Sequence, residues 1–154
     1  MTVSADFSKK DLQFCIKPST RELHEMDILC FRTPWNEKDY IEMQKNTLFN
    51  CWLFEIRNMY KVGLLVFSIF HPELEILKFG IHPRWRKRGL AEKMIDSLEL
   101  IYEKDKVNCI FLEVHCENKS AISLYYKKGF KEIGRRKNYF KNPSGDAILL
   151  KKLL

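Results

Sequence analysis

The chain has 154 residues, of which 45% are hydrophobic and 31% charged, which fits a globular protein and excludes a disordered or fibrous one. The formal net charge of +7 suits a nucleic acid, a phosphorylated cofactor or only a lysine-rich surface, and charge alone does not separate these. The apolar run 63–70 is too short to span a bilayer, and the polar N-terminus lacks the apolar core of a secretory signal. We therefore expect a cytoplasmic protein with a single domain over 1–154, of which 1–10 form a flexible tail.

Apolar periodicity and turn residues predict the following elements in chain order: strand 13–17, helices 20–31 and 36–45, strands 48–57, 60–70 and 73–82, helix 90–102, strand 108–115, helix 118–128, and strands 130–140 and 147–153. Ser19 with Glu22 forms a capping box that begins the first helix, and Asn36 caps the second. The apolar alternation of strand 73–82 slips near Lys78, which suggests a bulge. Asn142-Pro143-Ser144-Gly145 joins the last two strands.

The order of these elements decides the class of sheet. A strand, a helix and a second strand in succession imply parallel pairing in the middle of the sheet, and the flanking hairpins imply antiparallel edges. Five cysteines without a C-x-x-C pair and four scattered histidines show no metal-binding spacing. Cys15, Cys51 and Cys109 lie in apolar stretches, which is typical of buried thiols. We expect no metal site.

A basic turn precedes the helix that starts near Leu90. Arg86, Lys87 and Arg88 lie directly before Gly89, where unpaired N–H groups of a helix N-terminus attract phosphate. Gly89 lets the backbone approach an anion closely because it has no Cβ. The turn therefore indicates a phosphate-binding loop, although a basic turn that only caps an ordinary helix would have the same sequence.

Glu113 lies between Leu112 and Val114 on a strand predicted to be central. Because side chains alternate across a strand, Glu113 points away from the face of its two apolar neighbours. A buried carboxylate is costly unless it has a partner or a function. If its face lines a cleft, Glu113 can act as a general base, directly or through a water molecule. The alternative is a solvent-facing glutamate on a half-exposed strand.

Tyr125 shares one face of the helix 118–128 with Ala121 and Leu124. A phenol, with a pKa of about 10, keeps its proton at neutral pH and can give it to a departing thiolate, whose conjugate acid has a pKa of about 8.5. Tyr125 is therefore a candidate general acid. The alternative is a core aromatic residue whose hydroxyl is bonded to the backbone.

Taken together, these motifs resemble the GCN5-related N-acetyltransferase (GNAT) superfamily over about Gln13 to Leu153, most strongly from Phe79 to Phe130. The turn from Arg86 to Ala91 is similar to that family's coenzyme A pyrophosphate loop, and the stretch from Asn118 to Phe130 is similar to its later coenzyme-binding motif. Within the superfamily, the chain most resembles the bacterial ribosomal-protein-alanine N-acetyltransferase (RimI-like) group. That likeness lies in Thr33-Pro34-Trp35-Asn36, Leu112-Glu113-Val114, Arg135 to Phe140, and Asp146-Ala147-Ile148.

The resemblance implies an α/β (α+β) GNAT fold, with a mixed, mostly antiparallel central sheet of about seven strands flanked by about four helices. It implies acetyl transfer from acetyl-coenzyme A, the donor co-substrate, by direct attack of an amine, with Glu113 as general base and Tyr125 as general acid. It implies coenzyme contacts from Phe79, Gly80, Ile81, Arg86, Lys87, Arg88, Gly89, Leu90, Ala91, Glu92 and Asn118. Trp35 and Tyr139 would contact the acceptor. His115 and Phe140 depart from the RimI-like pattern and bear on acceptor identity.

By the same resemblance, the acceptor is a protein N-terminal α-amine, first of all the N-terminal alanine of a ribosomal protein. The acidic stretch from Arg21 to Glu42 would guide a basic peptide, although two solvated helix faces explain it equally well. Acetylation of a lysine side chain or a small amine, coenzyme binding without turnover and nucleic-acid binding stay open as alternatives. For nucleic acid, Trp85 in the basic turn is the only hint. The sequence indicates neither a membrane partner nor a particular oligomeric state.

Overall fold

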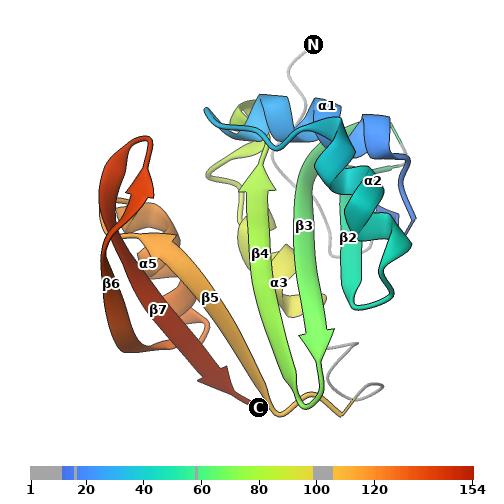
Figure 1. Cartoon of the computed structure of the whole chain (residues 1–154). Helices are drawn as coiled ribbons and strands as arrows, with labels where there is room; N and C mark the ends of the chain where they lie inside the picture. The colour runs from blue at the N-terminus through green and yellow to red at the C-terminus, as the bar shows by residue number, and fades with distance from the viewer. Residues whose placement is uncertain (1–11, 16, 58, 99–105) are drawn as a thin grey trace. The chain divides into compact units, whose positions relative to one another are not determined.

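The structure is a computed structural model that describes residues 12–15, 17–57, 59–98 and 106–154. Its seven-stranded sheet has the order β1-β2-β3-β4-β5-β7-β6. The strands are β1 (Leu12–Cys15), β2 (Phe49–Ile56), β3 (Tyr60–Phe70), β4 (Glu73–Ile81), β5 (Cys109–His115), β6 (Lys131–Lys141) and β7 (Ser144–Leu153). The α-helices are α1 (Thr20–Cys30), α2 (Glu37–Lys45), α3 (Leu90–Asp96) and α5 (Lys119–Lys127), with a 3-10 turn η2 (Pro83–Trp85) (Figure 1).

The strand pairing is mixed, as the sequence predicts. β1 is antiparallel to β2, β4 is parallel to β5, and β7 pairs antiparallel with both β5 and β6. The parallel pair follows from the helical crossover between β4 and β5, because parallel strands cannot be joined by a tight turn. The predicted fold, a mixed and mostly antiparallel sheet of seven strands with helices, is confirmed.

The chain groups into two compact units. The first unit contains Met1–Val66 and Lys78–Asp96, and the second contains Phe67–Leu77 and Ser97–Leu154. The first therefore holds α1, α2, β2, α3 and the ends of β3 and β4 that flank them, while the second holds the β3–β4 hairpin, β5, α5, β6 and β7. The expectation of a single domain over 1–154 stays a prediction.

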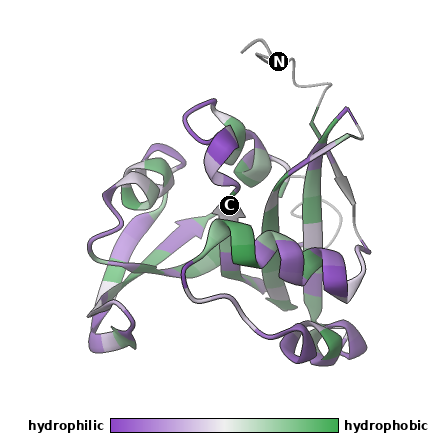
Figure 2. Cartoon of the chain, turned by 90° about the horizontal axis from the view of Figure 1, so that it is seen from above, coloured by the Kyte–Doolittle hydropathy of each residue, from purple (hydrophilic) through white to green (hydrophobic). Residues whose placement is uncertain are grey.

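The core of the first unit is formed by the apolar strands and the helices packed on them. In Figure 1, α2 lies in front of β2 while α3 passes behind the strands. Figure 2 shows the strands at the right as mostly hydrophobic and the helices as mixed. Gly63 of β3 permits this packing, because a Cβ there would lie 2.5 Å from the carbonyl oxygen of Gly80 and 3.1 Å from the Met94 side chain. Met94 of α3 is fully buried.

Local sequence decides where the first two helices begin. The Ser19 hydroxyl accepts from the Glu22 amide at 3.3 Å, and the Glu22 carboxylate accepts from the Ser19 amide at 2.9 Å. This is the predicted capping box. Asn36 is the N-cap of α2, and its amide donates to Asp39 Oδ2 at 2.8 Å. The Ser19 cap is confirmed, and Asn36 takes the predicted N-cap position, although its side chain forms no cap hydrogen bond.

The second unit places α5 behind β5 and β7 in the view of Figure 1. Asn118 caps α5, with its side-chain oxygen accepting from the Ala121 amide at 3.2 Å. Gly129 ends the helix with φ +84°, in the left-handed region that favours glycine. The Phe130 amide donates to the Tyr125 carbonyl at 3.0 Å and closes the turn. The prediction that Gly129 ends this helix is confirmed.

Some predicted details differ from the structure, and others fall on residues that it does not describe. β7 begins at Ser144 and pairs it with Lys141, so Ser144 and Gly145 belong to the strand and not to the predicted joining loop. The predicted tail 1–10 and the predicted continuation of the third helix over 99–102 lie outside the described residues. The bulge predicted near Lys78 is not needed, because Lys78 takes a buried position of β4 and burial alternates regularly from Leu74 through Ile76 and Lys78 to Gly80. Cys51 and Cys109 are buried free thiols, as predicted.

Membrane insertion through a helix finds no support in the described part of the chain, where none of the helices is long and apolar enough to cross a bilayer.

Candidate functional site

The predicted site residues fall into two sets, one in each unit. The residues expected to hold the coenzyme's pyrophosphate and acetyl group lie at the end of β4 and in the loop and helix after it, all in the first unit. Glu113, Tyr125, Asn118 and Tyr139 lie in the second unit. Trp35, the other predicted acceptor contact, lies in the first.

Gly80 is a glycine because the end of α1 lies directly against it. A Cβ on Gly80 would come 2.6 Å from the Phe31 ring and 2.9 Å from the Cys30 Cβ. Contacts that short force something to shift, so any larger residue here would push the end of α1 away from β4. Phe79 and Ile81, the other two predicted strand contacts, flank it as half-buried and buried residues.

Arg86 fixes the basic loop to the elements around it. Its Nε donates to the Ile81 carbonyl at 3.0 Å, and its Nη2 donates to the Cys30 carbonyl at 3.1 Å. The Arg86 amide donates to the Pro83 carbonyl at 3.3 Å. The guanidinium is therefore a clamp between the loop, β4 and α1, and only its remaining N–H groups are left for the predicted pyrophosphate contact.

Lys87 and Arg88 are the exposed cations of this loop. Lys87 has φ +59° and Gly89 has φ +71°, so the backbone turns through the left-handed region on both sides of Arg88. The Arg88 guanidinium lies 5.1 Å from the centroid of the Trp85 ring. Within the described residues, neither Lys87 nor Arg88 forms an ion pair with a carboxylate. Leu90, Ala91 and Glu92 follow in the first turn of α3, and Leu90 is buried.

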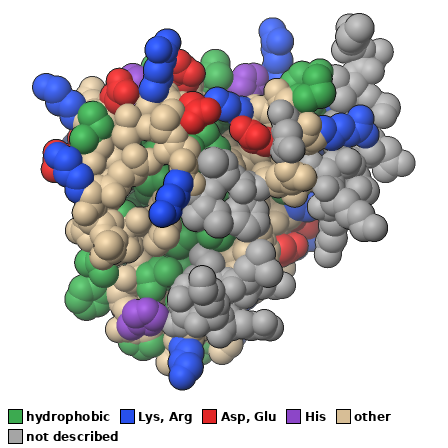
Figure 3. Space-filling view, turned by 90° about the vertical axis from the view of Figure 1, so that its right-hand side faces the viewer, with side chains coloured by type: hydrophobic (Ala, Val, Ile, Leu, Met, Phe, Trp, Pro, Cys, Tyr) green, Lys and Arg blue, Asp and Glu red, His purple; other side chains and the backbone are tan. Residues whose placement is uncertain are grey.

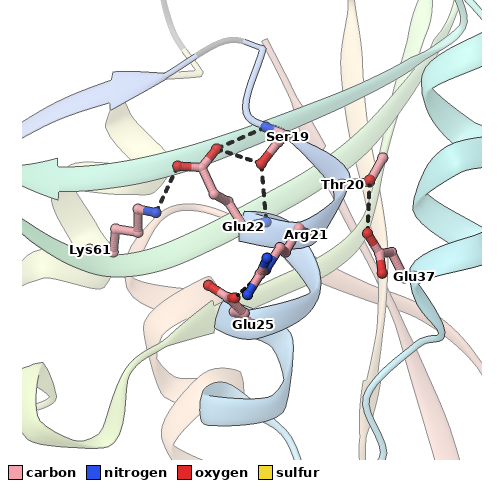
Figure 4. Close-up of polar contacts among 7 residues, drawn as sticks. All are labelled: Ser19, Thr20, Arg21, Glu22, Glu25, Glu37 and Lys61. Carbon is pink, nitrogen blue, oxygen red and sulfur yellow. Dashed lines mark hydrogen bonds and ion pairs between the residues drawn. The ribbon is translucent and has the colours of Figure 1, made fainter.

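The acidic stretch of α1 and α2 is largely neutralised by its own neighbours. Figure 4 shows the Glu22 carboxylate between Ser19 and Lys61, and Glu25 beside Arg21. The ion pairs are Glu22–Lys61 at 2.7 Å, Glu25–Arg21 at 3.0 Å and Glu42–Lys45 at 2.7 Å, while Glu37 accepts a hydrogen bond from the uncharged Thr20 hydroxyl at 3.2 Å. Figure 3 shows charges of both signs side by side on the side of the molecule that it views. That this stretch guides a basic peptide stays a prediction, with two solvated helix faces as the alternative.

A buried ion pair anchors Trp35. Asp27 is fully buried, and its Oδ2 accepts from Lys78 Nζ at 2.6 Å, from the Tyr40 hydroxyl at 2.7 Å and from the Trp35 amide at 2.9 Å. The Lys78 ammonium also lies 4.4 Å from the Trp35 ring centroid and 4.7 Å from that of Phe31. Burial lowers the pKa of Lys78, and the Asp27 carboxylate opposes that shift. The cluster fixes the loop after α1, and its only signal in the sequence is the irregular apolar pattern at Lys78.

Glu113 lies on the wall of a cavity within the second unit. The cavity measures about 250 Å³ and is lined by Ser68, Phe70, Glu73, Glu75, Phe111, Leu112, Glu113, Arg136 and Leu149. The Glu113 side chain is 20% exposed, and its Oε1 lies 3.1 Å from Arg136 Nη1. Interaction with the Glu113 carboxylate raises the pKa of the Tyr139 phenol. Glu113 is therefore a partly buried carboxylate with a cationic partner, and its role as general base stays a prediction.

Arg136 is the neighbour of Glu113 that sequence reasoning missed. Between the pairs Arg136–Ala147 and Phe140–Gly145, β6 spans four residue steps while β7 spans two. This irregularity, with Asn138 at φ +51°, resets the alternation of β6. Arg136 and Tyr139, three residues apart, can therefore both reach Glu113, whereas in a regular strand they would point to opposite faces.

Tyr125 lies in α5 with its ring buried against Phe130, whose centroid is 5.4 Å away. Burial raises the pKa of Tyr125 above its ordinary value, so the phenol stays protonated. No hydrogen bond to the Tyr125 hydroxyl exists among the described residues, which speaks against the alternative of a hydroxyl tied to backbone. The side-chain oxygen of Asn118 caps α5, so its amide N–H groups are the part left for the predicted pantetheine contact.

His115 and Phe140, the two departures from the RimI-like pattern, pack on each other in the second unit. Their ring centroids are 5.2 Å apart. His115 Nε2 lies 3.3 Å from the Pro143 carbonyl oxygen. A Cβ on Gly145 would collide with the His115 ring, so the turn between β6 and β7 and the end of β5 constrain one another. That these two residues bear on acceptor identity stays a prediction.

The basic loop, the strand carboxylate and the buried phenol are together typical of one known protein family. The model of the acetyltransferase (GNAT) family matches residues 20–130, most of the chain. The chain belongs to this family. The resemblance that the motifs indicated is thereby confirmed, and the protein is an acetyl-coenzyme A-dependent N-acetyltransferase.

Two named acetyltransferases are similar to this chain in sequence. The [ribosomal protein bS18]-alanine N-acetyltransferase of Escherichia coli is 29% identical over 119 residues, covering 76% of this chain and 79% of the relative. N-alpha-acetyltransferase 50 of Danio rerio is 30% identical over 141 residues, covering 87% of this chain and 82% of the relative.

Solved structures support the family fold. The crystal structure of the Escherichia coli ribosomal-protein-S18-alanine N-acetyltransferase has a TM-score of 0.83 and 21% identity, covering 92% of this chain and 93% of that one. A GNAT family acetyltransferase from Elizabethkingia anophelis, solved with acetyl-coenzyme A bound, has a TM-score of 0.73 and 19% identity. The match covers 94% of this chain and 99% of that one.

Proposed function

We propose that the protein, acting in the cytoplasm, transfers the acetyl group of acetyl-coenzyme A to the N-terminal α-amine of another protein. The first candidate acceptor is the N-terminal alanine of a ribosomal protein. The observation that carries this proposal is the placement of Glu113 on a cavity wall, where Arg136 and Tyr139 hold its carboxylate. The acceptor class is supported by the names of both relatives, which specify alanine N-acetylation and N-alpha-acetylation.

The residues of the first unit fit the diphosphate of the coenzyme. Lys87 and Arg88 are exposed cations without a carboxylate partner in the described residues, and a diphosphate is the type of ligand that such cations attract. Gly89 leaves the backbone open to an anion, because a Cβ at this position would meet nothing within 4 Å. The coenzyme, when bound, supplies a thioester whose carbonyl carbon an amine can attack. Phe79, Gly80, Ile81 and Asn118 are the proposed contacts for the rest of its arm.

Two proton transfers complete the proposed reaction. The α-ammonium, with a pKa of about 7.7–8.0, first gives its extra proton to solvent, and Glu113 then takes the proton that the neutral amine loses as its nitrogen bonds to the acetyl carbon. The amine nitrogen bonds to the acetyl carbon while the bond from that carbon to sulfur breaks. Tyr125 gives its proton to the departing sulfur, and burial keeps that proton available by raising the pKa of the phenol. The products are an amide and a free thiol; Glu113 releases its proton to solvent, and Tyr125 regains one.

The decisive experiment measures free-thiol release from acetyl-coenzyme A with a peptide that begins in alanine and continues with arginines. The same peptide with a blocked N-terminus is the control. We expect thiol release with the open peptide alone, and mass spectrometry should locate one acetyl group on the N-terminal residue. Equal release with both peptides, or none with either, would contradict the proposed acceptor.

A further inference from the structure

Arg136 occupies the space beside Glu113 that a positively charged acceptor would need. We propose that Arg136 determines specificity: its guanidinium restricts the acceptor to amines that reach Glu113 uncharged, and so favours an N-terminal α-amine over a lysine ε-amine. This inference rests on the proposed role of Glu113 as base. It assigns Arg136 a positioning and selecting role, not a part in the chemical step.

The Arg136 side chain is held in place by contacts from its own strand and from β5. Because β7 lies between β6 and β5, Arg136 must cross β7 to bring Nη1 to 3.1 Å from Glu113 Oε1. Its guanidinium carbon lies 5.3 Å from the centroid of the Tyr139 ring, and interaction with the same carboxylate raises the pKa of Tyr139. The three side chains thus form a closed triangle, although the Arg136 side chain is 54% exposed.

The positive charge of Arg136 would make the site discriminate between charged and neutral amines. An ammonium hydrogen-bonded to the other oxygen of Glu113 would lie roughly 5 Å from the guanidinium. Like charges at about that distance near a protein surface change a binding equilibrium by roughly five- to several-hundredfold. A neutral amine does not suffer this repulsion and can still use the free lone pairs of the carboxylate.

The two classes of amine differ in how often they arrive neutral. At pH 7.5, roughly a third of terminal α-amines are uncharged, against roughly one in a thousand lysine side chains, given their ordinary pKa values. A lysine must therefore bind as a cation and lose its proton at the site. That route needs a carboxylate whose charge is not already shared with Arg136.

The other residues that line the cavity do not add to the positive charge of Arg136. Glu73 and Glu75 of β4 line the same cavity as Glu113, and both would attract a cation. β7 contributes Leu149, which is apolar, and the other lining residues apart from Arg136 carry no positive charge. Removing the guanidinium would therefore leave three carboxylates and no cation among the lining residues, with Lys151, whose Nζ lies 4.5 Å from the Phe111 ring centroid, beside them.

The test compares two acceptor peptides on three variants. One peptide has a free N-terminal alanine followed by arginines; the other has a blocked N-terminus and a single lysine in place of one arginine. In Arg136→Gln we expect the ratio of kcat/KM for the α-amine to that for the ε-amine to fall about tenfold, because the repulsion is lost. Arg136→Lys keeps the charge and should keep the ratio within about twofold.

Arg135→Gln is the matched control. Arg135 is also 54% exposed and pairs with a glutamate of β6, Glu132, at 2.7 Å. Its removal should leave the ratio unchanged. Circular dichroism of each variant shows whether it is folded, and the ratio is unaffected by any fraction of inactive protein.

The outcomes separate this inference from the proposed function. If Arg136→Gln lowers both activities by the same factor, Arg136 only orients Glu113, and the inference is overturned while the proposed function stands. If Arg136→Lys loses the ratio as fully as Arg136→Gln, charge is not the cause, and the inference again fails. If the unmodified protein does not acetylate the α-amine peptide, the proposed function fails and the inference falls with it.

Discussion

Each of the two compact units contains a carboxylate paired with a long cationic side chain, and the two pairs share little else. Asp27 and Lys78 are 0% and 7% exposed, and one oxygen of Asp27 accepts three hydrogen bonds. Glu113 and Arg136 are partly exposed and line a cavity. The first pair belongs to the packing of α1, α2 and β4, whereas the second belongs to a surface that a ligand can enter.

Burial is what separates a pair that supports the fold from one that can react. A buried charge cannot give up its partner, because an uncompensated charge in the interior is strongly unfavourable. A half-exposed pair contributes little to stability, so an incoming group can compete for either member. By this criterion Asp27 is part of the framework, and Glu113 is the carboxylate available for chemistry. Four experiments test this distinction.

Replacing Lys78 with methionine should have the largest effect. The substitution keeps the length of the side chain but leaves Asp27 charged and without its cation, so we expect a loss of about 3–5 kcal/mol in the free energy of unfolding. Lys61→Met is the matched control, because Lys61 pairs with Glu22 at 2.7 Å in a partly exposed position and should cost less than about 1 kcal/mol. Urea unfolding at pH 7 measures both. Equal losses would erase the distinction between the pairs.

Replacing Glu113 with glutamine should affect activity and leave stability nearly unchanged. We expect acetyl transfer to an α-amine peptide to slow about a hundredfold, the lower end for a lost general base, because the amine is only weakly basic. The free energy of unfolding should change by less than about 1 kcal/mol. Glu132→Gln, which breaks the Arg135 pair on β6, is the control and should keep full activity. A fully active Glu113→Gln enzyme would remove Glu113 from the reaction.

Replacing Tyr125 with phenylalanine should slow thiol release about tenfold, because a thiolate with a conjugate-acid pKa of about 8.5 leaves with modest help. The buried ring is kept, so the fold should not suffer. Tyr126→Phe is the control on the same helix, since Tyr126 is exposed and its hydroxyl contacts Glu132 at 3.4 Å. If the two variants behave alike, Tyr125 has no special role as an acid.

The smallest effect is expected for Glu22. Its partly exposed ion pair with Lys61 should contribute little to the free energy of unfolding, and only above acidic pH. The hydrogen bond from Lys61 and those from Ser19 lower the pKa of Glu22 from 4.5 to about 2. A lowered folded-state pKa stabilises the protein above about pH 4.5, and this contribution disappears as the pH falls toward 2. Glu22→Gln should therefore cost less than about 1 kcal/mol at pH 6. Unfolding at pH 6 and 2.5 tests this, and an equal cost at both would disprove it.

Local signals in the sequence were sufficient for the elements and for the family. Ser19 with Glu22, Asn36 and Gly129 mark helix ends through contacts that span only a few residues, and all of these predictions are confirmed. The loop around Gly89 and the strand of Glu113 were found in the same way. The chemistry of these groups is readable because residue type and spacing alone carry it.

Contacts between distant parts of the chain were not readable. Asp27 and Lys78 are 51 residues apart, and each on its own resembles an ordinary surface charge. For the acidic stretch of α1 and α2, the sequence counts charges but does not show their partners, such as Lys61 for Glu22. Arg136 was missed because the irregularity in β6 breaks the alternation that assigns side chains to faces.

That irregularity also has a consequence for how related enzymes can diverge. Asp146 Oδ1 accepts from the Asn138 amide at 2.8 Å and holds the extra length of β6 in place. Shortening or lengthening the chain by one residue between Arg136 and Tyr139 would turn one of them away from Glu113. If Arg136 selects the acceptor as proposed, insertions and deletions at this point would change which amines are accepted, while Glu113, Tyr125 and the loop around Gly89 keep their sequences.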